Sequence, residues 1–550
     1  MISHSMVQGH IVDPVNKRIY DATLFIEDGR IVEIRPLSVP AEKELPFILP
    51  GFIDSHVHIE SSMLLPAQFA RVAARHGTVG VVTDPHEIAN VLGIPGVDYM
   101  VADGRDIPFH FCFGAPSCVP CTGMETAGAV LSAADIDALM QRDDIGFLAE
   151  MMNVPGVLYD DPEVLGKLEA ARKYGKPIDG HAPGLLGDGL KKYASLGITT
   201  DHECTTLEEA RERLDVGIDV LIRNGSAAQD FDTLSPLLAD YDDHLMFCSD
   251  DLHPDNLMRG HINLLVQRAV AKGYPLWNVL RAACVTPVRH YNLPCGLLQL
   301  GDSADFIVVD NLTDFNIQAT CISGNVFNPI VQMPTHDVAE CKCPNHFHAQ
   351  PITSDDLRLA PEGDCARAIV AYNGLLVTGE KIVTPNVVND NVVSDTGHDV
   401  LKVMVLNRYE AGARPSLGLI KGFGLKRGAL ASSIAHDSHN IVAIGTSDEA
   451  IVVAVNELIR VGGGIVVTDG EGTMRSLPLP IAGLISPQPC EVVAARYSEL
   501  TDHARSLGCV FDAPFMTLAF MALPVIPKLK ITDRGIFDAE QFTYTHLFVK

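Results

Sequence analysis

Two histidines stand one residue apart where a hydrophobic run of the sequence ends. In "LPGFIDSHVHIESS" (residues 49–62), apolar residues give way to His56, Val57 and His58, and then to Glu60 and two serines. Side chains alternate along a β-strand, so His56 and His58 would point to the same face and could bind one metal ion together. The stretch therefore predicts a metal site at the end of a strand.

Further residues of the same kind stand at the ends of later apolar runs. A glutamate ends "IGFLAE", histidines end "KPIDGH" and "ITTDH", and an aspartate ends "HLMFCSD". Four imidazoles and two carboxylates can hold a pair of divalent ions with Glu150 as the bridge, and mixed nitrogen and oxygen ligation suits Zn²⁺, Fe²⁺ or Mn²⁺. The predicted metal ligands are His56, His58, Glu150, His181, His202 and Asp250.

Short apolar runs that alternate with helix-like stretches must position these side chains. Eight runs between Phe47 and Asp251 each close on polar residues, and stretches such as 64–77 and 162–175 between them read as helices ending at glycine. This alternation predicts an α/β fold with a (β/α)₈ TIM-like barrel, whose catalytic groups lie at the carboxyl ends of the strands. A doubly wound open sheet is the alternative that counting strands leaves open.

The regions outside the barrel predict two further domains. Short β-like pieces in 1–48 and in 297–350 would pair into one flanking split β-sandwich domain, on either side of a metal-binding barrel at 49–296. Residues 351–550 carry their own strands and glycines and predict a C-terminal α/β domain. The stretch 330–360 is polar and punctuated by proline, which is typical of a loop or linker.

Composition narrows the class of protein. The 550 residues are 47% hydrophobic with a formal net charge of −28, which disfavours binding to nucleic acid or anionic membranes. We find no 18-residue apolar span and no apolar leader segment, and the 13 cysteines are scattered as reduced thiols would be. We therefore expect a cytoplasmic protein of two to four domains that acts on a small molecule.

Longer motifs carry a family resemblance. "GFIDSHVHIESSM", "TDPHEIANVLG", "SCVP", "AEMMNVPGV", "DGHAPGL", "TDHECTT" and "CSDDLHP" resemble the adenine deaminases of the amidohydrolase superfamily. The likeness continues past the barrel in "SLGLIKGFGLKRGALASSIAHDSHNIVAIG" and "LPLPIAGLIS". It implies hydrolytic deamination of adenine to hypoxanthine and ammonia by a metal-activated hydroxide at a binuclear centre. The same six ligands follow by match, with Glu150 where many superfamily members have a carbamylated lysine, and with two Mn²⁺ or Fe²⁺ ions (Zn²⁺ also possible).

The resemblance also suggests catalytic roles. Asp250 can accept the proton of the attacking hydroxide and pass it toward the departing amine, and His202 could polarise the surroundings of the attacked carbon. Protonation of purine N1 needs an acid, and both Glu87 and Glu203 are candidates.

Other polar residues are candidates for substrate binding, each beside a structural alternative. "DPHE" (84–87) could line the purine pocket, hold an auxiliary metal, or simply form a capped turn. "HDSHN" (436–440) could reach the active site of its own or a neighbouring subunit, or only join two strands. The predicted substrate-binding residues are Glu60, Asp84, His86, Arg223, Asp251, His436, Asp437 and His439.

Two cysteine motifs are weaker indications of a metal site than the barrel motifs. Cys118 and Cys121 form a CxxC that, with His58 and Glu60, resembles the site of zinc nucleobase deaminases, but Ser117 replaces the proline of that signature. "CKCPNHFH" offers Cys341, Cys343, His346 and His348 as zinc ligands, in a spacing typical of no common zinc finger.

Two other functions remain open from the sequence. A related amidohydrolase could act on another purine or on a cyclic amide, because barrel ligands alone do not fix the pocket. A catalytically inactive nucleobase-binding homologue is the second. By analogy with other barrel enzymes, a homodimer or higher homo-oligomer is expected.

Overall fold

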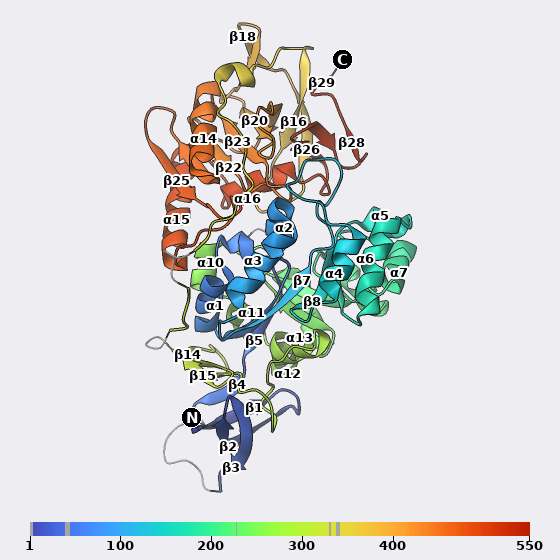
Figure 1. Cartoon of the computed structure of the whole chain (residues 1–550), viewed down its shortest axis with the longest axis vertical. Helices are drawn as coiled ribbons and strands as arrows, with labels where there is room; N and C mark the ends of the chain where they lie inside the picture. The colour runs from blue at the N-terminus through green and yellow to red at the C-terminus, as the bar shows by residue number, and fades with distance from the viewer. Residues whose placement is uncertain (1–3, 39–44, 227, 329–331, 337–340, 550) are drawn as a thin grey trace.

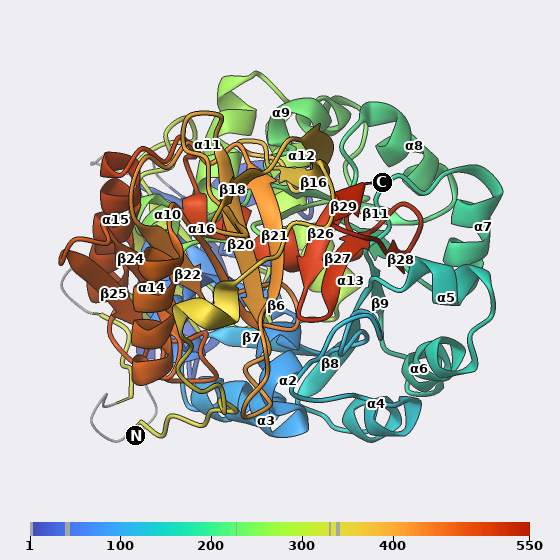
Figure 2. The same ribbon diagram turned by 90° about the horizontal axis from the view of Figure 1, so that it is seen from above.

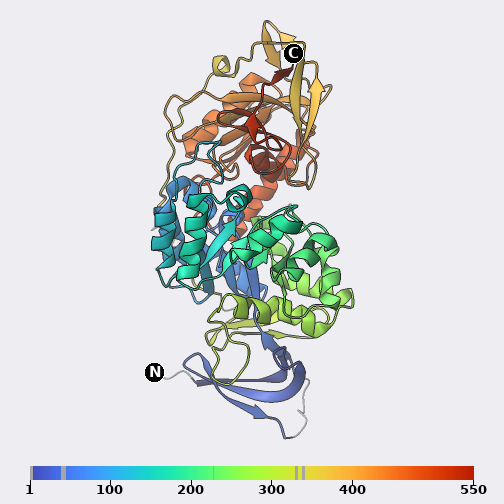
Figure 3. The ribbon, with the colours of Figure 1, turned by 90° about the vertical axis from the view of Figure 1, so that its right-hand side faces the viewer.

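The computed structural model describes residues 4–38, 45–226, 228–328, 332–336 and 341–549. Residues 330–331 and 337–340 of the predicted linker lie outside this set. A β-rich flanking domain, a barrel and a C-terminal domain follow one another along the long axis of the molecule (Figures 1 and 3). Seen from the C-terminal end, the third domain covers the barrel (Figure 2).

The barrel consists of eight parallel strands paired in chain order. Backbone bonds also join the first strand to the last, because Asp250 N donates to His56 O at 2.9 Å and His58 N donates to Asp250 O at 3.3 Å. An open sheet would leave these two edges apart, so the (β/α)₈ prediction is confirmed. The strands are β5 (Phe52–Val57), β6 (Thr78–Thr83), β7 (His110–Ala115), β8 (Ile145–Met151), β9 (Ile178–Gly180), β10 (Thr200–Asp201), β11 (Asp219–Arg223) and β12 (Leu245–Cys248).

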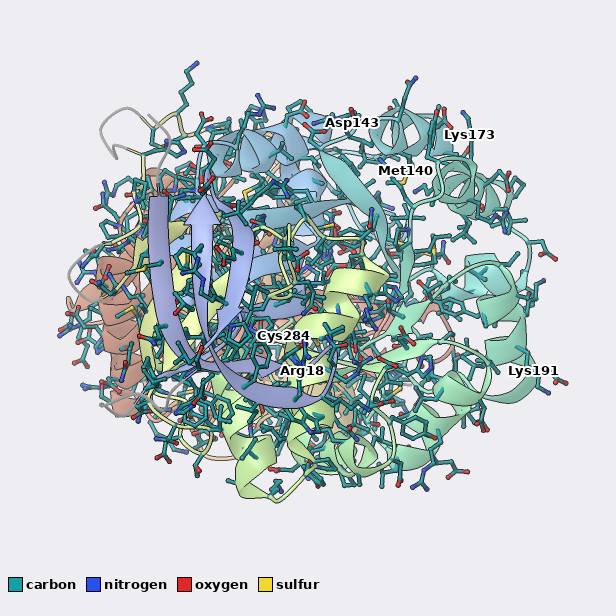
Figure 4. All side chains as sticks on the ribbon, turned by 90° about the horizontal axis from the view of Figure 1, so that it is seen from below. Arg18, Met140, Asp143, Lys173, Lys191 and Cys284 are labelled. Atoms are coloured by element: carbon teal, nitrogen blue, oxygen red, sulfur yellow. The ribbon has the colours of Figure 1, made fainter. Side chains whose placement is uncertain are left out.

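The apolar runs of the sequence become strands that are covered on both faces. β5, β6 and β12 are buried at every position, as expected of parallel strands between a barrel interior and a layer of helices. The covering helices start on clear signals: α1 (Pro66–Arg75) has proline in its first turn, and Asp161 caps α6 (Pro162–Lys173). Figure 4 shows Lys173 and, on α7 (Gly187–Ser195), Lys191 pointing outward.

Strands from both sides of the barrel segment form one flanking sheet of seven strands, in the order β15-β14-β13-β4-β1-β2-β3. The chain leaves β4 and enters β5 through Gly51, where an added Cβ would lie 2.1 Å from Val79 Cγ1. The flanking sheet thus anchors the strand that carries His56 and His58. Its strands are β1 (His4–Asp13), β2 (Arg18–Glu27), β3 (Arg30–Pro36), β4 (Phe47–Pro50), β13 (Phe306–Val309), β14 (Ile317–Ile322) and β15 (Asn325–Phe327).

The C-terminal domain is built on a nine-stranded sheet, with helices and two small sheets, of two and three strands, beside it. Its β22 (Ala429–Ser432) and β23 (Ile441–Gly445) are fully buried neighbours, and the loop between them is buried except at Ile434. Helix α15 (Cys490–Ser506) packs against barrel helix α10 (Pro254–Arg259). Within the described part of the chain, no helix combines the length and apolar character needed to cross a bilayer.

Candidate functional site

The predicted metal ligands converge at the carboxyl ends of the barrel strands. The Nε2 atoms of His56 and His58 lie 3.2 Å apart, and they lie 3.5 and 3.2 Å from Asp250 Oδ1. Five of the six predicted ligands are buried, and His181 is partly exposed. Residues from five different strands or strand ends therefore meet at one point.

Glu150 connects the two halves of this group. One carboxylate oxygen lies 3.5 Å from His58 Nε2, while the other lies 3.1 Å from His202 Nε2 and 2.8 Å from His181 Nδ1. The carboxylate therefore spans both sets of imidazoles, which is the position that a bridging ligand requires.

Backbone contacts fix the direction in which His58 and Asp250 present their ligand atoms. His58 Nδ1 lies 3.1 Å from the Asp84 carbonyl, which can only accept, so Nδ1 carries the proton and Nε2 is left as the ligand atom. Asp250 has a left-handed backbone conformation with φ 56°, one that Asp tolerates better than most residues. Its bonds to β5 hold that conformation, and the carboxylate turns into the barrel mouth.

The electrostatics of the group favour cations. Burial acts to raise the pKa of Glu150, but the His181 and His202 imidazoles hold this pKa well below its usual value. Burial likewise opposes the charged form of His181, and yet Glu203 and Glu150 raise its pKa to about 9. A site that holds protons on imidazoles so firmly also stabilises a divalent cation that replaces them.

The donor set fits divalent metal ions. Several groups of side chains bring their ligand atoms within 4.8 Å of one another, and three overlapping, fully buried groups contain predicted metal ligands. Each combines imidazole nitrogen with carboxylate oxygen, the mixture that Zn²⁺, Fe²⁺ and Mn²⁺ accept. The groups are His56, His58 and Asp250; His56, Glu150 and His202; and His58, Asp84, His86 and Glu150.

An arginine links the ligand group to a further acid. Arg223 Nη1 donates to Asp250 Oδ2 at 3.0 Å and also to Glu203. Asp230 accepts from the same guanidinium at 3.0 Å. Arg223 is thus neutralised by three carboxylates and fixes Glu203 beside Asp250.

Glu87 is held by the C-terminal domain. His436 Nδ1 lies 2.6 Å from one of its oxygens, and His439 Nε2 pairs with the other. All three side chains are buried, with at most 4% of each residue exposed. The "HDSHN" loop between β22 and β23 therefore reaches the barrel mouth of its own chain, and it makes a direct cross-domain contact there.

These residues surround a small cavity with a free volume of about 30 Å³. Its polar lining includes the predicted residues His86, Glu87, Arg223, Asp251 and Asp437, together with most of the metal ligands. Its other wall is apolar and was missed by sequence reasoning, because no spacing relates these side chains to the barrel motifs. The apolar lining residues are Met152, Leu376, Phe520, Leu523 and Ile526.

Three residues predicted to bind substrate lie behind the cavity and do not line it. Glu60 accepts from Ile88 N at 3.2 Å, and Asp84 accepts from His86 Nδ1 at 3.0 Å. His439 Nε2 pairs with a carboxylate oxygen of Glu87. Glu60 and Asp84 stand where the chain turns into a helix after β5 and β6, and both carboxylates bond to α2 (His86–Leu92). A substrate-binding role for these three residues stays a prediction.

The two cysteine motifs lie apart from this cavity. Cys118 Sγ lies 4.0 Å from Met151 Sδ, and Cys121 donates to Glu125 at 3.3 Å, so both are packed inside the protein. In the second motif, Cys341 contacts Tyr99 Oη at 3.2 Å, while His346 packs edge-to-face against Tyr409 with ring centroids 5.1 Å apart. A zinc site in this second motif stays a prediction.

Comparison with known proteins decides the family. The amidohydrolase family matches residues 47–327, and the adenine deaminase C-terminal domain matches 375–543. An adenine deaminase of Salinibacter ruber is 52% identical over 99% of both chains. The chain belongs to the adenine deaminase family. Other adenine deaminases, from Methanosarcina mazei and Parabacteroides distasonis, are 47% and 46% identical over 98% and 99% of this chain and 99% of their own. The resemblance seen in the sequence is confirmed, and membership of the amidohydrolases implies divalent metal ions in the site.

Proposed function

We propose that this protein hydrolyses adenine to hypoxanthine and ammonia. The observation that carries the proposal is the convergence of imidazoles and carboxylates at the barrel mouth, in a chain that matches adenine deaminases from end to end. Its substrate is a small molecule, and the site combines a polar rim with an apolar wall, which suits a flat heteroaromatic base.

Two divalent ions are assigned to the six predicted ligands. His56, His58, Glu150, His181, His202 and Asp250 would hold them, with Glu150 between the two. When bound, such ions lower the pKa of a coordinated water into the neutral range, so that it can act as a nucleophile. Mn²⁺ or Fe²⁺ is the proposed native metal, and Zn²⁺ fits the same donors.

Asp250 is assigned the proton transfer at the attacked carbon. Its Oδ1 faces His56 and His58, while its Oδ2 is bonded to Arg223. Oδ1 would take the proton of the attacking water and give it to the departing amine. Arg223 would keep the carboxylate in place during both transfers. His202, which packs against His56, would polarise the surroundings of the attacked carbon.

Glu203 is the better of the two candidates for protonating purine N1. It lines the cavity close to Asp250, and the C-terminal domain leaves its carboxylate free to face the cavity. Burial acts to raise the pKa of Glu203, although Arg223 lowers it below its usual value. Glu87 also lines the cavity, but both of its oxygens are already bonded to imidazoles of the C-terminal domain. We assign Glu87 to positioning, and His86, Asp251, His436 and Asp437 to the polar rim of the purine site.

The cellular compartment and the oligomeric state of the enzyme are also part of the proposal. None of the 13 cysteines, all of which are described, forms a disulfide, and this supports a reducing compartment such as the cytoplasm. A homo-oligomer is proposed by analogy with other barrel enzymes. Because "HDSHN" reaches the site of its own chain, the purine site does not need a loop from a neighbouring subunit.

The test is ammonia release from adenine by protein purified without chelator and supplied with Mn²⁺. Hypoxanthine should form in equal amount, and EDTA should stop both. The Asp250→Asn protein is the control for a contaminating deaminase, because such an activity would persist in it. If the protein holds metal but releases no ammonia from adenine, the substrate assignment is wrong. Other purines and cyclic amides are then the substrates to test.

A further inference from the structure

The cavity beside the predicted ligands is too small for the substrate proposed for it. A water molecule needs roughly 10–15 Å³ of such volume, so about 30 Å³ accommodates two or three waters. A purine base is several times larger. Some wall of the cavity has to move before a purine can enter. The barrel wall is held in place, because its strand ends are bonded to one another around the closed sheet.

The opposite wall comes from two segments of the C-terminal domain. Leu376 lies in the connection between β16 (Cys365–Val370) and β17 (Gly379–Val383). Phe520, Leu523 and Ile526 lie between α16 (Pro514–Ala519) and β26 (Leu529–Thr532). We call residues 372–378 and 520–528 the lid. Four of the five apolar residues that line the cavity belong to it.

The first segment of the lid has an apolar inner side and a solvent-exposed outer side, whereas the second segment is largely buried. Leu375 and Val377 are 52% and 44% exposed, whereas Leu376 between them turns toward the cavity. Phe520 is 5% exposed, and its ring stacks on His436 with centroids 4.4 Å apart and an interplanar angle of 17°. A flat aromatic surface beside a polar rim is what a purine base needs for stacking.

Lys530 joins the two segments of the lid into one unit. Its fully buried amino group donates to Phe520 O at 2.8 Å and to Leu376 O at 3.0 Å, one bond to each segment. Thr378 adds further bonds, from its N to Pro527 O and from its Oγ1 to Leu529 O, both at 2.8 Å. The segments are thus bonded to each other as well as to the sheet behind them.

We propose that the lid opens as one unit to admit the purine, and that Phe520 and Leu376 then pack on the faces of the base. The inference rests on the proposed function for the identity of the ligand, but the coupled opening of the two segments does not depend on it. The lid would make the C-terminal domain the part of the enzyme that recognises the base, while the barrel carries the chemistry.

Hydrogen exchange measured by mass spectrometry on the metal-loaded protein tests the opening without any substrate. We expect both lid segments to exchange faster than β20 (Val400–Leu406), a fully buried strand of the same domain. Lys530→Met should speed exchange in both segments together by about tenfold. The matched control is Lys402→Met, which also removes a fully buried lysine but one that bonds to Leu357 O and Asp448 away from the cavity. Exchange in the lid as slow as in β20, or a response confined to one segment, overturns the proposal of a single moving unit.

Steady-state kinetics test the contact with the base. Phe520→Ala should raise KM for adenine by about tenfold with the bound metal unchanged, because a stacking surface is lost. Phe511→Ala is the control, since this buried ring packs on Phe423 in the same domain and does not line the cavity. Equal KM values in the two variants overturn the assignment of Phe520. If the wild-type protein does not act on adenine at all, the proposed function fails, while the exchange experiment still decides the lid.

Discussion

Two clusters of histidine and carboxylate lie close together in this protein, and they differ in how their atoms are paired. In the ligand cluster (His56, His58, Glu150, His181, His202 and Asp250), several imidazoles share each carboxylate at distances from 2.8 to 3.9 Å. In the cross-domain triad (Glu87, His436 and His439), His436 Nδ1 lies 2.6 Å from one oxygen of Glu87 and His439 Nε2 pairs with the other, while His86 Nε2 is more distant at 3.6 Å.

The difference shows that residue types alone do not define a metal site. The ligand cluster points the ring nitrogens of His56 and His58 at each other, and a bound cation is what stabilises such an arrangement. The triad satisfies both oxygens of Glu87 inside the protein. We therefore attribute chemistry to the ligand cluster, and to the triad the attachment of the C-terminal domain to the barrel mouth.

Asp250→Asn should have the largest effect on activity. The amide can neither take up the proton of water nor balance the metal charge, so kcat for adenine should fall by a factor of about 10²–10⁴. The fold should persist at the assay temperature, but the loss of a buried charge beside Arg223 should lower the melting temperature, which thermal unfolding measures. Activity near the wild-type level would exclude Asp250 as the proton carrier.

Glu150→Gln should lower the metal content of the protein, which tests whether the two clusters differ in metal binding. Loss of the shared carboxylate removes the ligand between the two halves, so at least one of the two expected metal equivalents should be lost per chain, as measured by elemental analysis of dialysed protein. Glu87→Gln, the matched substitution in the triad, should keep both. Equal metal content in the two variants would mean that the clusters do not differ in the way proposed here.

The sequence predicts one cluster much better than the other. His56, Glu150 and Asp250 could be found because each ends an apolar run, and the ends of parallel strands meet at one edge of a barrel. No such rule relates Glu87 to His439, which lie 352 positions apart and meet through the packing of two domains. The apolar lid was invisible for the same reason, since Phe520 and Leu376 carry no chemistry of their own and are placed only by tertiary contacts.

Glu87→Gln should have its main effect on stability. The substitution removes a buried charge that two imidazoles face, and breaking such a pair costs about 3–5 kcal/mol. The free energy of unfolding in urea is the measurement. Glu491→Gln serves as the control, because Glu491 also joins two domains, through Arg71 and Arg75, but its side chain is 39% exposed. A loss under about 1 kcal/mol is expected there. Equal losses in the two variants would show that the triad does not hold the domains together.

The smallest expected effect is on the pH dependence of the free energy of unfolding, through Lys530, which joins the two segments of the lid. Burial lowers the pKa of Lys530 to about 7, well below its ordinary value. Between this pKa and that of the unfolded chain, the unfolded state binds a proton that the folded state does not, so Lys530 makes the protein more stable as the pH rises. The difference in unfolding free energy between wild type and Lys530→Met should therefore shift in favour of wild type by about 2 kcal/mol from pH 7.5 to 9. Lys381→Met, at an exposed position of β17, should leave this difference flat. A flat difference for Lys530→Met as well would mean that Lys530 keeps its proton in the folded state, and that a charged ammonium group joins the two segments of the lid across this whole range of pH.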